Sequence, residues 1–559
     1  MIKSFIATKT KPKMKRAVIF LLSAICVFMI YPQNVKTMKN DYGDLWLKVA
    51  EYEKKSLPQS ALKVVDEIIE QAMEDDNSPQ LIKAVIHKGK YNIARDEENF
   101  TSMFDSLDGM LVKSKDPVEK AVLHSMLGQL YLEYYDYNEW TINQRTDLKG
   151  FVPDDINEWT KNIFYDKVVE HIIASLEPQD VLANTQVESY SAIIDMGKDS
   201  RDYFPTMFDF LAGRAVQYLE MIKSDIDLSR MLARRGLSKS DLFVKANDFV
   251  NINLDPGKED YNLWVYYAYQ KWLKSLIDRG MSESVLLTEL HYIENLNSSF
   301  RSKITNIEIS LPLLYELLED WKDKPESVEV VDRIADYHLR WVEDDEEDTE
   351  EDLKTERAVY DMLVEYIDKY PNYKRVSTLK NRLNDMTRSY ANVSGNTTFP
   401  INGKKEFEVE FKNINSLAVK VYKLNSPLDA LNLEYNYERR TRYNKQLLKT
   451  ISVSLPTNLE KYEKGKVNFS VDVDEPGVYM LDFDTNPAEK NKDYNDNLIF
   501  AVSRFTIFSR YVSENNYDFF VVDRSTGEPI EDADIKIYKL PGMVLAVDGL
   551  ARLYAYRYD

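Results

Sequence analysis

The chain has 559 residues with a formal net charge of −21, and 44% of its residues are hydrophobic. This length is sufficient for about three or four domains of ordinary size, and the hydrophobic content excludes a chain that is disordered throughout. Because an acidic surface repels phosphate backbones, we expect no nucleic-acid partner.

The first segment, residues 1–35, has the pattern of an export signal. Lys15 and Arg16 form a short basic region, and the uncharged apolar run 17–30 follows directly. The run is shorter than a typical membrane-spanning helix, so we predict a cleaved leader starting at Met14 and an exported mature chain without a membrane span.

Cys26 is the single cysteine of the chain, and it lies inside this predicted leader. Lipid anchoring through Cys26 is the alternative interpretation, but Ile25 stands where a lipidation signal requires a small residue. We therefore favour a mature chain without a lipid anchor, a disulfide or thiolate chemistry.

Residues 36–390 show helical periodicity. Apolar residues fall on one face at helical spacing in 58–72, 78–93 and 116–134, and the last two segments open with a capping residue followed by proline. Short capped helices with brief connections predict a helical, repeat-like domain of the tetratricopeptide type.

Aromatic residues gather in 261–277, which contains Trp264, Tyr266, Tyr267, Tyr269 and Trp272. Such a group could bind a sugar or a peptide, but packing between helices is the more frequent use, and we favour it.

The acidic run 343–352 invites comparison with a calcium site. It lacks the glycine and the alternation of a hand-type loop, so we predict a solvated connection between two helices.

No motif for catalysis, cofactors or metals was found. The five histidines are His87, His124, His171, His291 and His338, and none has a ligand-like short spacing. The sequence also lacks a nucleophile elbow, a phosphate loop and a dinucleotide fingerprint. We predict a protein that is not an enzyme and that has no catalytic, cofactor-binding, metal or thioester residues.

The pattern changes near residue 390, where a turn-rich segment precedes alternating strands. Residues 407–411 alternate as a strand, and we predict a hairpin with 417–424. A second hairpin is predicted from 466–473 and 478–484, and 498–512 reads as one continuous strand. These strands predict an antiparallel β-sandwich.

A further strand-turn-strand pattern lies in 519–539. Residues 519–522 and 535–538 alternate as strands, and 523–527 supplies the turn residues. The predicted organisation is a leader in 1–35, a helical domain in 36–390, a sandwich in 391–490 and a second sandwich in 491–559.

These segments resemble a known family. The residues that carry the resemblance are FEVEFKNINSLAVKVYKL (407–424), DEPGVYMLDF (474–483) and FFVVDRSTGEPIEDADIKIYK (519–539), together with helical segments such as 45–72 and 201–220. They are similar to the macroglobulin-type domains and helical N-terminal region of the bacterial alpha-2-macroglobulin family. The resemblance implies macroglobulin sandwiches, endopeptidase partners, and the periplasm or cell surface of a Gram-negative bacterium.

Members of that family trap proteases through a cleavable bait and often through a thioester. No residue here matches either feature, and 549–559 reads as a strand of an unfinished second sandwich. The expected function is therefore the N-terminal part of an alpha-2-macroglobulin-like inhibitor, acting as a scaffold without cofactors. An envelope nutrient-uptake accessory protein and a repeat-type protein-binding scaffold are the alternatives.

Overall fold

The computed structural model describes residues 42–552, except 96–100, 147–150, 223–226, 301–302, 344–349, 426–444, 488–497, 514–515, 532, 534, 541–542 and 549–550. The predicted leader with Cys26 lies outside the described residues. The chain divides into two compact units, Met1–Arg333 and Ile334–Asp559, and each is described by itself. The predicted domain limits stay predictions.

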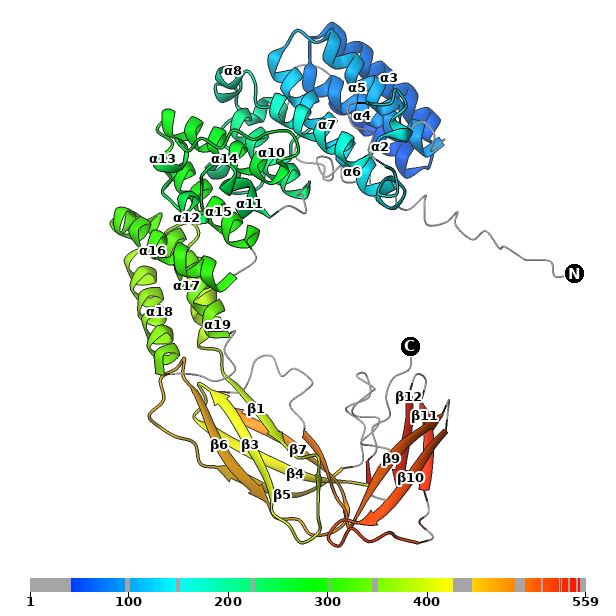
Figure 1. Cartoon of the computed structure of the whole chain (residues 1–559), viewed down its shortest axis with the longest axis vertical. Helices are drawn as coiled ribbons and strands as arrows, with labels where there is room; N and C mark the ends of the chain where they lie inside the picture. Colours follow the sequence, from blue (N-terminus) through cyan, green and yellow to red (C-terminus); the bar gives the residue numbers. More distant parts are fainter. Residues whose placement is uncertain are drawn as a thin grey trace, which may run out of the picture. The chain divides into compact units, whose positions relative to one another are not determined.

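The first unit is helical (Figure 1). Its described α-helices are α2 (Tyr42–Lys54), α3 (Pro58–Glu74), α4 (Ser78–Arg95), α5 (Ser102–Lys113), α6 (Pro117–Ile142), α7 (Lys161–Ala174), α8 (Gln179–Ala183), α9 (Ser200–Tyr203), α10 (Met207–Met221), α11 (Leu228–Ala233), α12 (Lys239–Leu242), α13 (Ala246–Phe249), α14 (Tyr261–Asp278), α15 (Ser282–Ser299) and α16 (Lys303–Trp321). Helix α17 (Ser327–Glu343) contains the division between the units.

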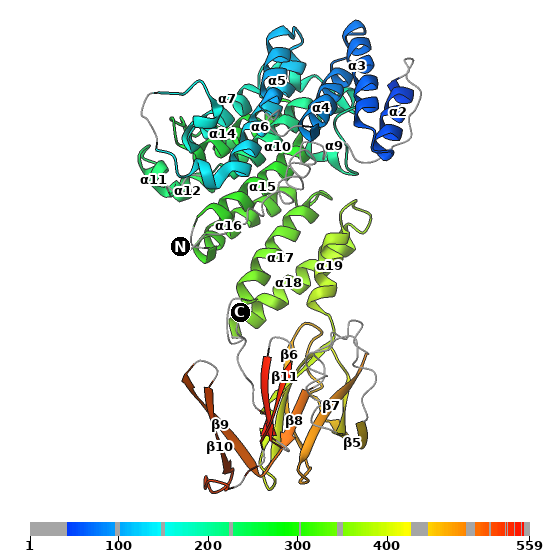
Figure 2. The ribbon, with the colours of Figure 1, turned by 90° about the vertical axis from the view of Figure 1, so that its right-hand side faces the viewer.

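Helices α2, α3 and α4 pack side by side around a shared apolar core (Figures 1 and 2). Helices α2 and α3 end in the same way. Ser56 and Asp76 adopt left-handed backbone conformations, with φ of 55° and 50°. The next amide then reaches back to close the helix, from Leu57 N to Tyr52 O and from Asn77 N to Ala72 O, each at 2.9 Å. A proline then stands at the start of the following helix, at its first position in α3 and at its second position in α4.

Helix α10 carries a buried acid that joins it to α14. Asp209 is fully buried, and its Oδ2 accepts hydrogen bonds from Thr206 N and Oγ1, which caps the helix. Its Oδ1 accepts from Arg279 Nη2 at 2.6 Å. One carboxylate therefore caps α10 and also pairs with the arginine that follows α14.

The second unit contains helices and the strands. The bounds of its described elements beyond α17 are α18 (Glu350–Lys369), α19 (Ser377–Met386), β1 (Tyr390–Gly395), β2 (Thr398–Phe399), β3 (Lys405–Lys412), β4 (Ser416–Leu424), β5 (Lys445–Val453), β6 (Lys464–Val471), β7 (Gly477–Asn486), β8 (Leu498–Val502), β9 (Phe505–Ser513), β10 (Asn516–Asp523), β11 (Ile535–Leu540), β12 (Met543–Asp548) and β13 (Ala551–Arg552). The change from helices to strands lies between Met386 and Tyr390. The order of helices followed by strands is the one that the sequence predicts.

Two sheets contribute side chains to one core. The strand orders are β1-β3-β6 in one sheet and β2-β8-β7-β4-β5 in the other. Phe407 and Phe411 enter the core from β3, while Val419, Tyr479 and Phe500 enter it from the second sheet. All strand pairs in both sheets are antiparallel except β2 with β8, so the predicted all-antiparallel arrangement is wrong at that pair.

The two predicted hairpins are wrong in their pairing. Strand β3 pairs with β1 and β6, whereas β4 pairs with β5 and β7. Strands β6 and β7 likewise lie in different sheets. Both tight turns cross from one sheet to the other, because each strand buries its apolar face against the opposite sheet. At the first crossing Asn413 has a φ of 50° and its Nδ2 donates to Thr387 O.

The predicted continuous strand 498–512 is interrupted at Ser503 and Arg504. Strand β8 pairs with β7 in the five-stranded sheet. Strand β9 pairs with β10, and β11 pairs with β12. Residues 519–522 and 535–538 thus both form strands, as predicted, and each pairs with another strand.

Candidate functional site

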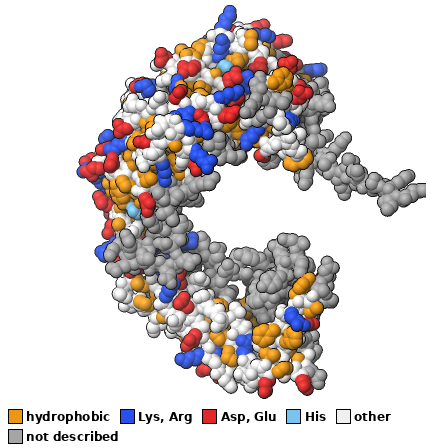
Figure 3. All heavy atoms as spheres, in the orientation of Figure 1, with side chains coloured by type: hydrophobic (Ala, Val, Ile, Leu, Met, Phe, Trp, Pro, Cys, Tyr) orange, Lys and Arg blue, Asp and Glu red, His pale blue; other side chains and the backbone are white. Residues whose placement is uncertain are grey.

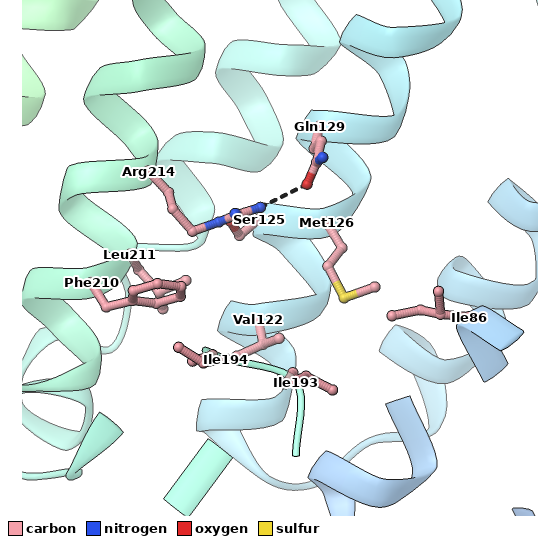
Figure 4. Close-up of a pocket in the computed structure, with 10 residues that line it drawn as sticks. All are labelled: Ile86, Val122, Ser125, Met126, Gln129, Ile193, Ile194, Phe210, Leu211 and Arg214. Atoms are coloured by element: carbon pink, nitrogen blue, oxygen red, sulfur yellow. Dashed lines mark hydrogen bonds between the residues drawn. The ribbon is translucent and has the colours of Figure 1, made fainter. Parts of the chain in front are cut away.

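A cavity lies inside the first unit between α4, α6, α10 and the segment at Ile193 and Ile194 (Figure 4). We call it the Arg214 cavity. Its wall is almost entirely apolar, and the polar lining groups come from α6 and α10. The lining residues are Ile86, Val122, Ser125, Met126, Gln129, Ile193, Ile194, Phe210, Leu211 and Arg214.

A chain of polar side chains runs along one wall of the Arg214 cavity. Arg214 Nε donates to Ser125 Oγ at 3.1 Å, and Arg214 Nη2 donates to Gln129 Oε1 at 2.7 Å. Gln129 Nε2 donates in turn to Glu133 Oε1 at 2.6 Å. Ser125, Gln129 and Glu133 are four residues apart on α6, so helical spacing places them in one row facing α10. Figure 4 shows the guanidinium lying between Ser125 and Gln129.

Burial decides the protonation of this polar chain. It raises the pKa of Glu133 from its ordinary value of 4.5 to about 8, although the bond from Gln129 and the charge of Arg214 oppose the change. Burial also lowers the pKa of Arg214. The guanidinium carbon of Arg214 lies 4.9 Å from the centroid of the Tyr218 ring, which makes a cation–π contact. At neutral pH Glu133 is therefore a neutral acid beside a charged guanidinium.

The size of the Arg214 cavity limits its chemistry. The volume of the cavity is about 30 Å³. One water molecule needs about 10–15 Å³ on that scale, so the cavity holds about two waters and is much smaller than the usual pocket for a substrate. The arrangement fixes α6 against α10 and offers no room for a small-molecule reaction.

A second candidate feature is the turn after β10. It contains the motif D-x-x-T-G-x-P, formed by Asp523, Thr526, Gly527 and Pro529. Asp523 Oδ1 accepts from Ser525 Oγ at 2.5 Å and from the amides of Ser525 and Thr526. Asp523 Oδ2 accepts from Arg504 Nε at 2.8 Å. These bonds, that of Ser525 first, lower the pKa of Asp523. The acid is therefore an internal turn acceptor.

The remaining motif residues close the same turn. Gly527 has a φ of 73°, where a side chain would be strained, and its amide donates to Asp523 O at 2.8 Å. Val522 forms an isolated bridge with Pro529. Each motif position that the sequence singled out thus has a structural task in the turn.

The aromatic group of 261–277 lies on α14. Tyr266, Tyr269 and Trp272 are buried, which is what the packing interpretation predicts, whereas Trp264 and Tyr267 are half-buried. Tyr266 donates to Asn295 Oδ1 on α15 at 3.0 Å. These rings join α14 to α15 and form no open platform.

The histidines fall in separate places, with one exception. His87 lies 3.8 Å from Glu53, and His291 bonds Tyr269 at 2.9 Å. His124 and His171, which the sequence separates by 47 positions, meet at 3.0 Å. No sequence signal identified this pair, because its spacing depends on how α6 packs against α7.

Two further features of the described residues bear on function. No three histidine, cysteine or acidic side chains among them gather closely enough to hold a metal ion. Within the same ranges, no helix combines the length and apolar character needed to cross a bilayer. Of the predicted loop 343–352, residues 344–349 lie outside the part of the chain that the structure describes.

Charged side chains of both signs are intermingled on the face seen in Figure 3, with no broad basic area. Hydrophobic side chains gather over β9 and β10 in the same view. Phe508 is 59% exposed and Phe520 is 49% exposed, and the two residues are paired across these strands.

Comparison with known proteins gives a limited likeness. No protein-family model matches the chain, and no curated protein matches it. Two solved structures of native alpha-2-macroglobulin from Escherichia coli, spanning domains MG0-NIE-MG1 and NIE-MG1, are similar over 30% of this chain at 14% identity and a TM-score of 0.23. The match spans 58% of the first structure and 88% of the second. A TM-score of 0.23 is too low to carry a functional argument.

Proposed function

We propose that the chain is part of an exported alpha-2-macroglobulin-like protein, in which it acts as a non-catalytic scaffold that binds other proteins. The observation that carries this proposal is the Asp523 turn. The D-x-x-T-G-x-P residues on which the family resemblance rests serve there as an internal acceptor, a left-handed glycine and a bridging proline. The motif therefore has the physical basis of a repeated structural turn, as expected for a macroglobulin-type domain.

The two-sheet core supports the same proposal. Side chains of β1, β3 and β6 share one apolar core with those of the five-stranded sheet, which is the packing of a β-sandwich. We infer that these strands form a macroglobulin-type sandwich. Its turns cross between sheets, so the strands are connected as in a sandwich and not as a row of hairpins.

The chemistry of the chain favours a scaffold over an enzyme. The Arg214 cavity has room for about two waters, and its polar groups bond one another. A thioester needs a cysteine, and the sole cysteine is Cys26 in the predicted leader. We propose that any contact of this chain with an endopeptidase is reversible and needs no cofactor.

The test uses the purified full chain mixed with serine and metallo-endopeptidases in excess. We expect complexes that elute together from a sizing column and separate on boiling in detergent, with no effect of methylamine pretreatment. A boiling-stable adduct that methylamine abolishes would contradict the reversible scaffold. Absence of any complex would contradict endopeptidase partners.

A second candidate, a repeat-type protein-binding scaffold, is favoured by one specific observation. The same helix ending followed by proline recurs after α2 and after α3, at Ser56 and Asp76. Recurrence of one connection is typical of helical repeats. This candidate predicts binding to envelope proteins that are not proteases, with binding abolished by changes on the helices and unaffected by changes on β9 and β10.

A further inference from the structure

Two histidines from different helices meet at the contact of α6 with α7. The Nδ1 atoms of His124 and His171 are 3.0 Å apart, and the ring centroids are 5.1 Å apart with planes tilted by 43°. His171 is buried, whereas His124 is half-buried and leaves one side of the pair near solvent. Tyr131 packs on the buried side, with its ring centroid 5.5 Å from that of His171.

Two arrangements fit a nitrogen separation of 3.0 Å. One is a hydrogen bond in which one imidazole donates to the other. The other is a pair of ligands on one metal ion. Two nitrogens each about 2.0–2.1 Å from a metal at a right angle are about 2.9 Å apart, whereas a tetrahedral angle separates them by about 3.3 Å. The observed separation lies between these two values, so it fits two ligands on one metal ion.

Charged side chains of both signs lie near the two rings. Glu170 acts on both rings as a nearby negative charge, whereas Lys120 acts on His124 and Lys167 on His171 as nearby positive charges.

We propose that His124 and His171 form a two-histidine site for a divalent transition-metal ion, with Cu²⁺ bound most tightly and water filling the other positions. The order of affinity follows the general preference of nitrogen sites for Cu²⁺ over Ni²⁺ and Zn²⁺. This site is separate from the Arg214 cavity and from the proposed scaffold function, and it needs no third protein ligand.

The experiment titrates the full chain with Cu²⁺ by calorimetry and follows the copper spectrum by electron paramagnetic resonance. We compare the wild type with His124→Gln and His171→Gln, because glutamine can still hydrogen-bond the remaining imidazole but is a poor metal ligand. His291→Gln is the matched control, since His291 lies on α15 and bonds Tyr269. His124→Gln changes the half-buried ring, which keeps the test valid if His171→Gln fails to fold.

We expect the wild type and His291→Gln to bind one equivalent of Cu²⁺, with an electron paramagnetic resonance spectrum that shows two nitrogen ligands. His124→Gln should weaken that equivalent at least tenfold and remove one nitrogen from the spectrum. The melting temperature should rise with Ni²⁺ in the wild type and stay constant in His124→Gln. Equal affinity and equal spectra in wild type and His124→Gln, or no bound equivalent in the wild type, would overturn the proposal and leave only a hydrogen bond.

Discussion

The helical unit and the two-sheet core bury different kinds of side chain. In the helical unit, Asp209 is fully buried and pairs with Arg279 of α14. The two-sheet core is built mainly from apolar side chains such as Phe407 and Phe500, which lie 5.1 Å apart between ring centroids. Helix ends expose unpaired backbone amides that need polar partners, whereas strands satisfy their amides in the sheet. The buried charge of Asp209 therefore meets a need of a helix end that the paired strands do not have.

The largest expected effect comes from Asp209→Ala. The substitution removes the cap of α10 and leaves Arg279 without its buried carboxylate. We expect a loss of about 3–5 kcal/mol in the free energy of unfolding, measured by urea denaturation. The matched control is Asp241→Ala, which removes the same type of capping box at Ser238 in an exposed position. It should cost much less, because solvent screens an exposed cap. Equal losses would show that the pair with Arg279 adds nothing.

Phe500→Ala tests the apolar core of the sheets. Phe500 is fully buried and packs against Phe399, Phe407 and Tyr479. Truncation of a buried phenylalanine costs about 3–5 kcal/mol, and we expect about 3–4 kcal/mol in urea denaturation followed by fluorescence. The control Phe508→Ala, on the exposed face of β9, should change stability by less than about 1 kcal/mol. A comparable loss at Phe508 would show that its side chain is covered.

Glu133→Gln tests the buried acid of the helical unit. The pKa of Glu133 is about 8 in the folded chain and ordinarily 4.5, so the folded state keeps a proton that the unfolded state releases between these values. The contribution of Glu133 to stability should therefore fall as pH rises from 4.5 to 8, by up to about 1.4 kcal/mol per pH unit. Glu133→Gln should flatten this decline in urea midpoints measured at several pH values.

The control for this pH series is Glu139→Gln, which changes an exposed acid of the same helix. It should retain the wild-type decline. Glu289 should leave a residual slope in all variants, because burial raises its pKa to about 7. An unchanged slope in Glu133→Gln would contradict the assignment of a neutral acid beside Arg214.

The smallest expected effect is at Lys405, which is buried in the sheets. Lys405 Nζ donates to Ile401 O and to Asp474 Oδ1, each at 2.8 Å, and its side chain is 2% exposed. Lys405→Met keeps the apolar stem and loses both bonds, so we expect a loss of about 1–2 kcal/mol by thermal unfolding. Lys404→Met, at an exposed neighbouring position, should have no measurable effect. Equal results at both positions would show that the bonds contribute nothing.

Pairing and contacts between distant segments depended on the tertiary structure. Residues 407–411 and 417–424 form strands as their alternation predicts, yet they lie in different sheets. A short turn is compatible with a hairpin and with a crossing between sheets, and the shared core decides between them. Strand β8 likewise pairs with β2, which is distant from it in sequence. The contact of His124 with His171 likewise arises from the packing of α6 against α7.

The sequence by itself determined what depends on neighbours along the chain. Helical spacing and the cap at Asp116 predicted helices, and alternation after residue 390 predicted strands. The predicted cap at Ser78 is one position off, because Asn77 Oδ1 accepts from Gln80 N while Ser78 Oγ donates to Glu119. The turn at Asp523 followed from residues whose partners lie within a few positions. Burial, pKa shifts at Glu133 and the pairing of Asp209 with Arg279 came only from the tertiary structure, because desolvation depends on which distant segments cover a side chain.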